Sequence, residues 1–453
     1  MSVSLERDRA LREGFAADAS GLRMVPDAVA RPATPDEVVA IVRECASSQI
    51  PITAAGGQTS TTGASISDAG VLLSLRSMDR ILDIDANART MRVEPGAIIS
   101  DIKRAAAERG LLFAPDPTSE ESCTIGGSIA CNASGARTLR YGATRSHVRA
   151  LTVVLASGET TELRRNPLEK NTVGYEMVHD PLDWFVGSEG TLGLVVGAEL
   201  VLTPLPARVT GLSIPFASER EALGFVVAAR RSALSPRCLE YLDDLALGIT
   251  TVGHGDRMAP VGAAAAVYTE DAGEDDVDLD AWLQLAEAHG ALGDDVRIFD
   301  GEGALREARD ARHAIPATMN ERGARCRAAG GRKVSTDWAV PYPRLAEAIA
   351  VAREAARAAG VEQAVIYGHA GNGHPHQNFI ATDADEVKRI ERVVEETLRS
   401  VIAMGGTVAA EHGIGKIKRK WVGLQLSELQ MSMMRAVKRE LDPSGIFAPG
   451  NVL

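Results

Sequence analysis

The sequence predicts an α+β protein built in two main parts. In the first part, short apolar strands outnumber helices and alternate with glycine-rich loops. The segment Pro204-Leu205-Pro206 then indicates a boundary, because two prolines so close together do not fit inside a helix or a central strand. Beyond it, long helices rich in Ala, Glu, Arg and Leu alternate with strands. We therefore expect domains at 1–206 and 207–410, followed by a helical C-terminal segment at 411–453.

Local signals predict the individual elements. Thr34-Pro35-Asp36-Glu37 combines a capping residue with proline at the first helical position, which predicts a helix through about Cys45. The turn Ser157-Gly158 predicts a β-hairpin of residues 150–155 and 160–163. Further strands are predicted at 52–55, 71–75, 81–84 and 91–93, and further helices at 98–109, 218–232, 279–289, 344–359 and 416–453.

Composition excludes several classes of protein. The chain has 453 residues and a net charge of −12, so it lacks the broad basic face that nucleic-acid binding requires. Its five cysteines form no C-x-x-C pair and supply no ferredoxin-type Fe–S motif, which fits a reducing cytoplasm. The N-terminal residues are charged and contain no apolar signal-peptide core. We expect a cytoplasmic protein, with peripheral contact to the inner membrane face left open, and base rates favour a homodimer.

Three glycine-rich segments lie in the first half of the chain. The first, Gly56 to Gly63, follows a predicted strand but does not fit the Rossmann fingerprint G-x-G-x-x-G. The second runs from Asp116 to Gly142, and the third is Gly187-Ser188-Glu189-Gly190-Thr191-Leu192-Gly193. Glycines and small hydroxyl residues after a strand align backbone N–H groups that can bind a pyrophosphate. Three such segments together indicate a dinucleotide, which needs a long, close-fitting track of backbone.

In this order, the segments resemble the FAD domain of the vanillyl-alcohol-oxidase type. The resemblance covers residues from roughly 30 to the C-terminus and implies an FAD domain, a cap domain with an antiparallel sheet and flanking helices, and C-terminal helices that return to the FAD domain. Ala55 and Gln58 depart from the arginine and glycine of many relatives. No histidine or cysteine lies in the first loop, so we expect non-covalent FAD. The resemblance implies that its pyrophosphate loop is Gly56, Gly57, Gln58, Thr59, Ser60 and Gly63, and its flavin and ribityl contacts are Asp116, Thr118, Gly126, Gly127, Asn132, Ser134, Gly135, Gly142 and Glu189.

Four of the nine histidines fall in two short segments, 367–378 and 410–415. Two imidazoles and a carboxylate would make a divalent-metal site with open positions, and Zn²⁺ or Mn²⁺ suits such ligands. The pattern alone leaves the ligands open, since His374 and His376 would share one face of a strand and could chelate as a pair. The resemblance to D-2-hydroxyacid dehydrogenases implies a different set, namely His369, His376 and Glu411, and leaves His374 without an assigned role.

The resemblance also indicates how a substrate would be bound and oxidised. His412, next to Glu411, is the best candidate for a general base, because imidazole titrates near neutrality and can take the hydroxyl proton. An acid substrate needs a cationic anchor, and the resemblance implies Arg312 and Lys333, with Asn378 as a further polar contact.

We therefore predict an FAD-dependent D-2-hydroxyacid dehydrogenase of the D-lactate and D-2-hydroxyglutarate dehydrogenase group. D-lactate is the first expected substrate and D-2-hydroxyglutarate the next. Candidate electron acceptors are a quinone, a cytochrome, an electron-transfer flavoprotein and oxygen. The alternatives are an enzyme of the same superfamily with another substrate class, such as an ether-lipid or aldonolactone enzyme, and a non-catalytic FAD-binding electron-relay subunit.

Overall fold

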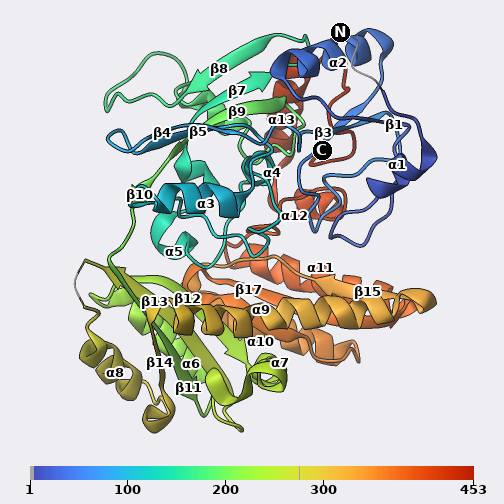
Figure 1. Ribbon diagram of the computed structural model, residues 1–453. Coiled ribbons are helices and arrows are strands. Elements are labelled where there is room, and N and C mark those ends of the chain that lie inside the picture. The colour runs from blue at the N-terminus through green and yellow to red at the C-terminus, as the bar shows by residue number, and fades with distance from the viewer. Residues whose placement is uncertain (1–4, 275) are drawn as a thin grey trace. The chain divides into compact units, whose positions relative to one another are not determined.

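The computed structural model describes residues 5–274 and 276–453 of the chain. It divides into two compact units (Figure 1). Unit 1 contains Met1–Ser134, Gly142–Leu205 and Glu411–Leu453, and unit 2 contains Gly135–Tyr141 and Pro206–Ala410. The chain leaves unit 1 within the Pro204-Leu205-Pro206 segment. Among the described residues, no helix combines the length and the apolar character needed to cross a membrane.

Unit 1 contains two main sheets. A parallel sheet has the order β1-β3-β2, and an antiparallel sheet has the order β4-β5-β9-β7-β8. A short antiparallel pair, β6 and β10, completes the strands. The strands are β1 Ala28–Ala30, β2 Ile52–Ala55, β3 Val71–Ser74, β4 Ile81–Asp85, β5 Thr90–Val93, β6 Leu111–Leu112, β7 Val148–Val154, β8 Thr160–Arg164, β9 Leu194–Val201 and β10 Thr203–Pro204. The helices are α1 Arg9–Gly14, α2 Pro35–Ser48, α3 Ile99–Ala107, α4 Ile125–Cys131, α12 Val422–Gln425 and α13 Glu428–Leu441.

Helix α2 shows how local signals set the elements of unit 1. The Thr34 hydroxyl accepts a hydrogen bond from the backbone N–H of Glu37, a cap that contributes about 1 kcal/mol. The Glu37 carboxylate accepts from the N–H of Ala33, one residue before the position that a reciprocal capping box would use. The buried face of the helix is Val38, Ile41, Val42 and Cys45, which pack in one core with the parallel sheet.

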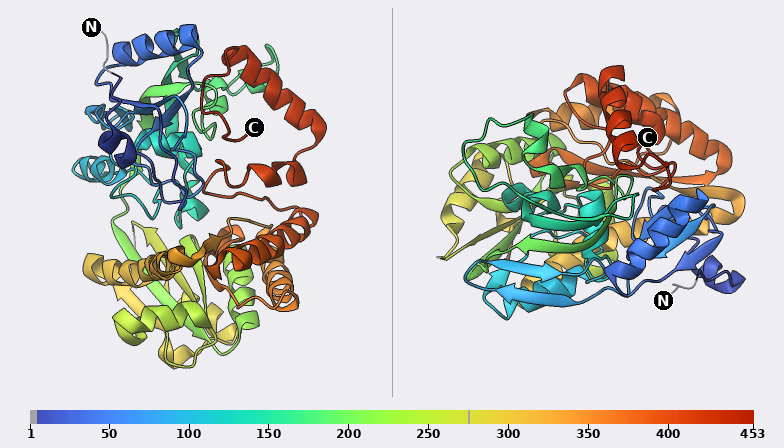
Figure 2. Two further views of the ribbon diagram at one scale, coloured as in Figure 1. Left: turned by 90° about the vertical axis from the view of Figure 1, so that its right-hand side faces the viewer. Right: turned by 90° about the horizontal axis from the view of Figure 1, so that it is seen from above.

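The C-terminal segment belongs to unit 1 but is less helical than expected. Helix α13 ends at Leu441, and residues 442–453 form no helix, which corrects the prediction of a helical stretch through Leu453. Figure 2 shows α13, in red, beside the strands of unit 1, where Lys438 Nζ donates to the carbonyl of Thr191 at 2.7 Å. After α13 the chain pairs with β2 instead, through a parallel bridge between Ile52 and Phe447.

Unit 2 is built on one antiparallel sheet with the strand order β14-β11-β13-β12-β16-β17-β15. The family-type fold predicted from the sequence, α+β with a large antiparallel sheet in the second domain, is confirmed. The strands are β11 Arg208–Phe216, β12 Pro236–Asp243, β13 Ala265–Gly273, β14 Arg297–Asp300, β15 Gly330–Ser335, β16 Val365–His369 and β17 His374–Asp383. The helices are α5 Thr138–Tyr141, α6 Glu219–Arg231, α7 Asp244–His254, α8 Leu279–Ala288, α9 Gly301–Arg325, α10 Leu345–Ala358 and α11 Ala384–Ala403.

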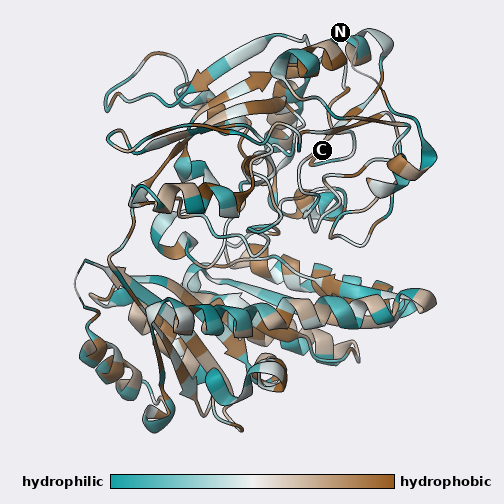
Figure 3. Ribbon diagram, viewed as in Figure 1, coloured by the Kyte–Doolittle hydropathy of each residue, from teal (hydrophilic) through white to brown (hydrophobic). Residues whose placement is uncertain are grey.

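Helix α9 positions part of the candidate site. It packs on one sheet face through buried residues that recur at helical spacing: Leu305, Ala308, Ala311, Ile315 and Met319. In Figure 3 the central strands of this sheet are largely brown, whereas α9 carries much teal on its surface. Pro316 lies inside the helix, where it removes one backbone hydrogen bond, so burial of the apolar face must outweigh that loss.

Candidate active site

Three histidines of unit 2 converge on one face of its sheet. β16 and β17 pair antiparallel, with Tyr367 opposite His376 and His369 opposite His374. Because alternate residues of a strand share a face, these imidazoles point to the same side. The ring centroids of His369, His374 and His376 lie 4.7 to 5.4 Å apart. The turn between the strands needs glycine at position 373, which has φ +69° and leaves no room for a Cβ against the carbonyl of Val340.

Asp337 adds a carboxylate to this group. Its Oδ1 lies 3.1 Å from Nε2 of His374, and the candidate ligand atoms of Asp337, His374 and His376 are within 4.8 Å of one another. Two imidazoles and one carboxylate are a donor set that suits Zn²⁺ or Mn²⁺. Asp337 was missed in the sequence because an isolated aspartate after a strand carries no motif. His374, left without a role by the resemblance, belongs to this group.

His369 has a different set of contacts. Its Nδ1 lies 2.7 Å from Oε1 of Glu240 on β12, and both side chains are buried. Glu240 also forms an ion pair with Arg312 of α9. The charge of the predicted carboxylate anchor Arg312 is therefore offset by a buried glutamate. No sequence motif identifies Glu240, because the pairing of β12 with β16 joins residues far apart in the chain.

Lys333 and Asn378 lie on the same sheet face as the histidines. Ser335 faces Asn378 across the β15–β17 pair, and Lys333 faces Ile380 two residues further along. Burial lowers the pKa of Lys333 to about 8. Asn378 is only 2% exposed, and within the described part of the chain neither its amide nitrogen nor its amide oxygen has a hydrogen-bond partner. Buried polar groups normally have partners, so this amide indicates a ligand.

In unit 1, the first glycine segment leaves β2 as an irregular loop. Gly56 and Gly57 lie against Thr124 and Ser122 so closely that neither position has room for a Cβ. Gln58 has φ +54°, and its side-chain amide donates to the carbonyls of Phe15 and Ser65. These hydrogen bonds of the Gln58 side chain hold the loop to two other segments of unit 1.

The backbone amides of this loop are available for a ligand. Among the described residues, the N–H groups of Gly57, Gln58, Thr59 and Ser60 donate to no acceptor of the protein. All four residues are half-buried, and buried N–H groups normally have an acceptor. A run of such donors in a concave loop is the kind of site that binds a phosphate group.

All of the other predicted cofactor residues except Gly135 belong to unit 1. Asn132 ends α4 in the left-handed conformation, and its Oδ1 accepts from the N–H of Arg145 at 2.9 Å. Gly135 lies in the short segment 135–141 of unit 2, where its N–H donates to the Thr138 hydroxyl. The remaining positions range from the buried Ser134 and Gly63 to the exposed Thr118, with Asp116, Gly126, Gly127 and Gly142 half-buried.

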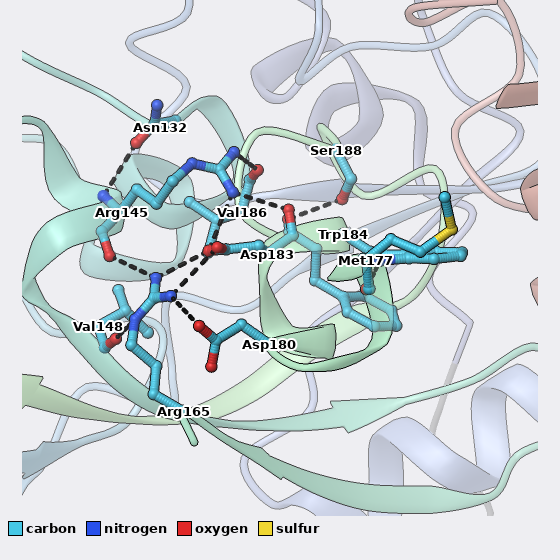
Figure 4. Close-up of polar contacts among 11 residues, drawn as sticks. Asn132, Arg145, Val148, Arg165, Met177, Asp180, Asp183, Trp184, Val186 and Ser188 are labelled. Atoms are coloured by element: carbon cyan, nitrogen blue, oxygen red, sulfur yellow. Dashed lines mark hydrogen bonds and ion pairs between the residues drawn. The ribbon is translucent and has the colours of Figure 1, made fainter. Parts of the chain in front are cut away.

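Two arginines hold the segment that leads to Glu189. Arg145 donates to the carbonyls of Asp183 and Val186, and Arg165 forms ion pairs with Asp180 and Asp183 (Figure 4). These contacts fix residues 180–188 against the start of β7. Because Glu189 follows directly after this segment, the same contacts also restrict its position in unit 1.

Glu189 anchors the Glu-His-Gly segment. Its carboxylate accepts hydrogen bonds from the backbone N–H groups of Ile414 and Gly415. Burial raises the pKa of Glu189, and these hydrogen bonds counteract the rise only in part. The hydroxyl of Thr62 donates to the carbonyl of His412 at 3.4 Å. The predicted base His412 is therefore held in the same unit as the glycine loop, and Glu411 begins this segment directly after the end of unit 2.

Comparison with known families agrees with both halves of this description. Residues 26–164 match the FAD binding domain family, and residues 205–452 match the family described as FAD linked oxidases, C-terminal domain. The second match alone covers more than half of the chain. The chain belongs to the FAD-linked oxidase family.

Relatives of this FAD-linked oxidase carry the names of hydroxyacid enzymes. It is 34% identical over 437 residues to a D-2-hydroxyglutarate dehydrogenase of Xanthomonas citri pv. viticola, and 31% identical over 437 residues to glycolate oxidase subunit GlcD of Bacillus subtilis. Each match spans 94% of this chain and 89% of the relative. A D-lactate dehydrogenase of Anaerostipes hadrus is 28% identical over 440 residues, with the same coverage of both chains.

A solved structure of alkyldihydroxyacetonephosphate synthase shares the fold. Its TM-score is 0.74 at 18% identity, over 98% of this chain and 82% of that one. At this identity the likeness establishes the fold alone.

The glycine loop of this FAD-linked oxidase fits the cofactor of its family. FAD carries a pyrophosphate, and the free amides of Gly57 to Ser60 are the donors that a pyrophosphate requires. Bound FAD would supply a hydride acceptor, which makes the protein an FAD-linked oxidoreductase.

Proposed function

We propose that this FAD-linked oxidase converts a D-2-hydroxy acid into the 2-oxo acid, with D-lactate and D-2-hydroxyglutarate as candidate substrates. The observation that carries the proposal is the polar face of the unit 2 sheet. Three imidazoles and Asp337 gather there beside the desolvated Lys333 and the unpartnered amide of Asn378. Relatives named for D-lactate and D-2-hydroxyglutarate support the same substrate class.

In this proposal the carboxylate of the substrate binds to Lys333 and Arg312. Among the described residues, no carboxylate shifts the pKa of Lys333, and burial alone lowers it. The charge of Arg312 is already offset by its ion pair with Glu240. Its main contribution to substrate binding would therefore be hydrogen-bond donors directed at the substrate carboxylate. Asn378 would bind a substrate oxygen through its amide.

We further propose that a divalent metal binds to His376 and Glu411 together with a second histidine. The resemblance assigns His369 and the geometry of unit 2 favours His374, whereas His376 belongs to both sets. The backbone N–H of Ala410 donates to the carbonyl of Asp337 at 2.8 Å. The peptide bond between Ala410 and Glu411 therefore begins next to Asp337. A metal of charge 2+ would lower the pKa of the substrate hydroxyl.

His412 is the proposed general base. The hydrogen on the α-carbon leaves with its electron pair as a hydride, which bound FAD would accept, and the hydroxyl proton must be removed so that a carbonyl can form. Neutral imidazole can accept that proton near pH 7. The anchoring of residues 414–415 by Glu189 supports a fixed position for His412.

Metal content of purified variants tests the ligand assignment. His376→Ala should lose the metal while it keeps FAD, because the glycine loop lies in the other unit. The comparison of His369→Gln with His374→Gln decides the second ligand. His254→Gln on α7 is a matched control, because His254 is not among the candidate ligands. Full activity after complete removal of metal would contradict the metal proposal.

Turnover of a His412→Ala variant tests the base. The enzyme proposal expects normal FAD content with a rate reduced by about two to four orders of magnitude. A non-catalytic electron-relay subunit would show no change in the activity of its complex.

A further inference from the structure

A second polar cluster lies on the same face of the unit 2 sheet, next to the candidate site. In the register of β12 and β13, Glu240 faces Tyr268 and Cys238 faces Glu270. Glu270 therefore lies opposite the residue two positions before Glu240, on the same face of the sheet. On α9, Arg309 precedes Arg312 by three residues, which places both on one side of the helix. The pair of Glu270 and Arg309 therefore lies alongside the pair of Glu240 and Arg312.

Glu270 is surrounded by arginine side chains. Arg237 donates to its Oε2 at 2.7 Å, and Tyr268 donates to its Oε1 at 2.8 Å. The guanidinium groups of Arg137 and Arg309 lie 3.8 and 4.0 Å from the same carboxylate. Burial alone would raise the pKa of Glu270, but Arg237 and Arg137 lower it below its usual value, so the group stays ionised. The side chains of Arg237, Arg137 and Arg309 thus all lie near this one carboxylate.

Arg309 is the member of this cluster that a ligand can reach. Its side chain is 34% exposed, whereas that of Arg237 is 5% exposed. In the described part of the chain, the contact with Glu270 at 4.0 Å is the one polar contact of its guanidinium. A guanidinium has five N–H donors, and arginine binds carboxylates through two parallel hydrogen bonds. The guanidinium of Arg309 therefore retains N–H donors that an anionic ligand could accept from.

We propose that Arg309 binds a second carboxylate of the substrate, with Arg137 and Arg237 supplying the surrounding positive charge. The inference rests on the proposed function, in which Arg312 and Lys333 bind the carboxylate next to the reacting carbon. Side chains three residues apart on a helix start about 5 to 6 Å from each other, a separation that suits the two ends of a short dicarboxylic acid. The substrate class is therefore a 2-hydroxy acid with two carboxylates, which favours D-2-hydroxyglutarate over D-lactate.

Binding of the two products tests this inference without turnover. The FAD-loaded protein is titrated calorimetrically with 2-oxoglutarate, which has two carboxylates, and with pyruvate, which has one. Wild type should bind 2-oxoglutarate at least about tenfold more tightly, since a hydrogen-bonded charge pair is lost with pyruvate. Arg309→Gln should lose about tenfold on 2-oxoglutarate and change less than about twofold on pyruvate. Arg220→Gln, an exposed arginine of α6 in the same unit, is the matched control, and Arg309→Lys should retain part of the preference.

The outcomes separate the two proposals. Equal affinity of wild type for the two acids, or an equal loss on both in Arg309→Gln, would overturn the second carboxylate site. A selective loss on 2-oxoglutarate in a protein whose flavin no D-acid reduces would support the site and contradict the proposed oxidation.

Discussion

Substitution of Lys333 links the electrostatics of the site to a measurable pH dependence. Burial lowers its pKa to about 8, so the free protein holds this positive charge at pH 7 and has largely lost it at pH 9. The charged fraction falls from about nine-tenths to about one-tenth over that interval, a tenfold change. If Lys333 binds the substrate carboxylate, kcat/KM should fall by about tenfold from pH 7 to pH 9.

The matched variant is Lys333→Arg, which keeps its charge throughout this range because a guanidinium does not deprotonate. We expect its kcat/KM to be lower at pH 7, since arginine differs in shape, but to stay nearly flat up to pH 9. Stopped-flow reduction of the flavin by the D-acid measures both profiles. An identical alkaline fall in Lys333→Arg would refute the role of Lys333.

The same shift affects stability, with a sign that can be checked. A pKa lowered from 10.5 to about 8 corresponds to a cost of about 3 kcal/mol for keeping the charge buried. Between these pH values the folded protein has released the proton and the unfolded chain still binds it, so stability should rise with pH in this window. Lys333→Met should be more stable than wild type at pH 7 and should lack this rise in urea titrations at each pH.

Three further substitutions test other parts of the account. Gly57→Ala places a Cβ where the neighbouring backbone leaves no room, so the flavin absorbance per protein molecule should drop sharply. Gly423→Ala is the control: this position has open space around it, so the variant should keep full FAD. Asn378→Ala removes an amide without a protein partner, so kcat/KM should fall by about tenfold while the melting temperature stays unchanged; an unchanged kcat/KM would argue against substrate contact. Arg165→Met removes the ion pair with Asp183 and should cost about 1 kcal/mol and speed proteolysis within residues 166–180, and equal cleavage rates would contradict this role.

Much of the fold could be predicted because its signals are local. The cap at Thr34 and the turn at Ser157-Gly158 each depend on a few neighbouring residues. Local signals also explain the errors. Helix α9 was not predicted, since Pro316 opposes a helix and only packing on the sheet compensates for it. The helix expected up to Leu453 stops at Leu441, where a strand contact replaces it.

The candidate site shows the same division. The histidine segment could be found from its spacing, and the shared face of His374 and His376 followed from strand periodicity, as the pairing of β16 and β17 shows. Asp337 and Glu240 could not be found, because each reaches the histidines through strand pairing or a turn that no motif encodes. The arginine cluster around Glu270 also depends on strands and helices that meet only in the folded chain.

The most direct test of the central proposal is an anaerobic visible spectrum of the purified protein during titration with single acids. The samples are D- and L-lactate and D- and L-2-hydroxyglutarate, each added separately. The account predicts a flavin spectrum that D-2-hydroxyglutarate bleaches, with D-lactate slower and both L-acids inert. A flavin that an L-acid bleaches equally well, or that none of the four acids reduces, would contradict it.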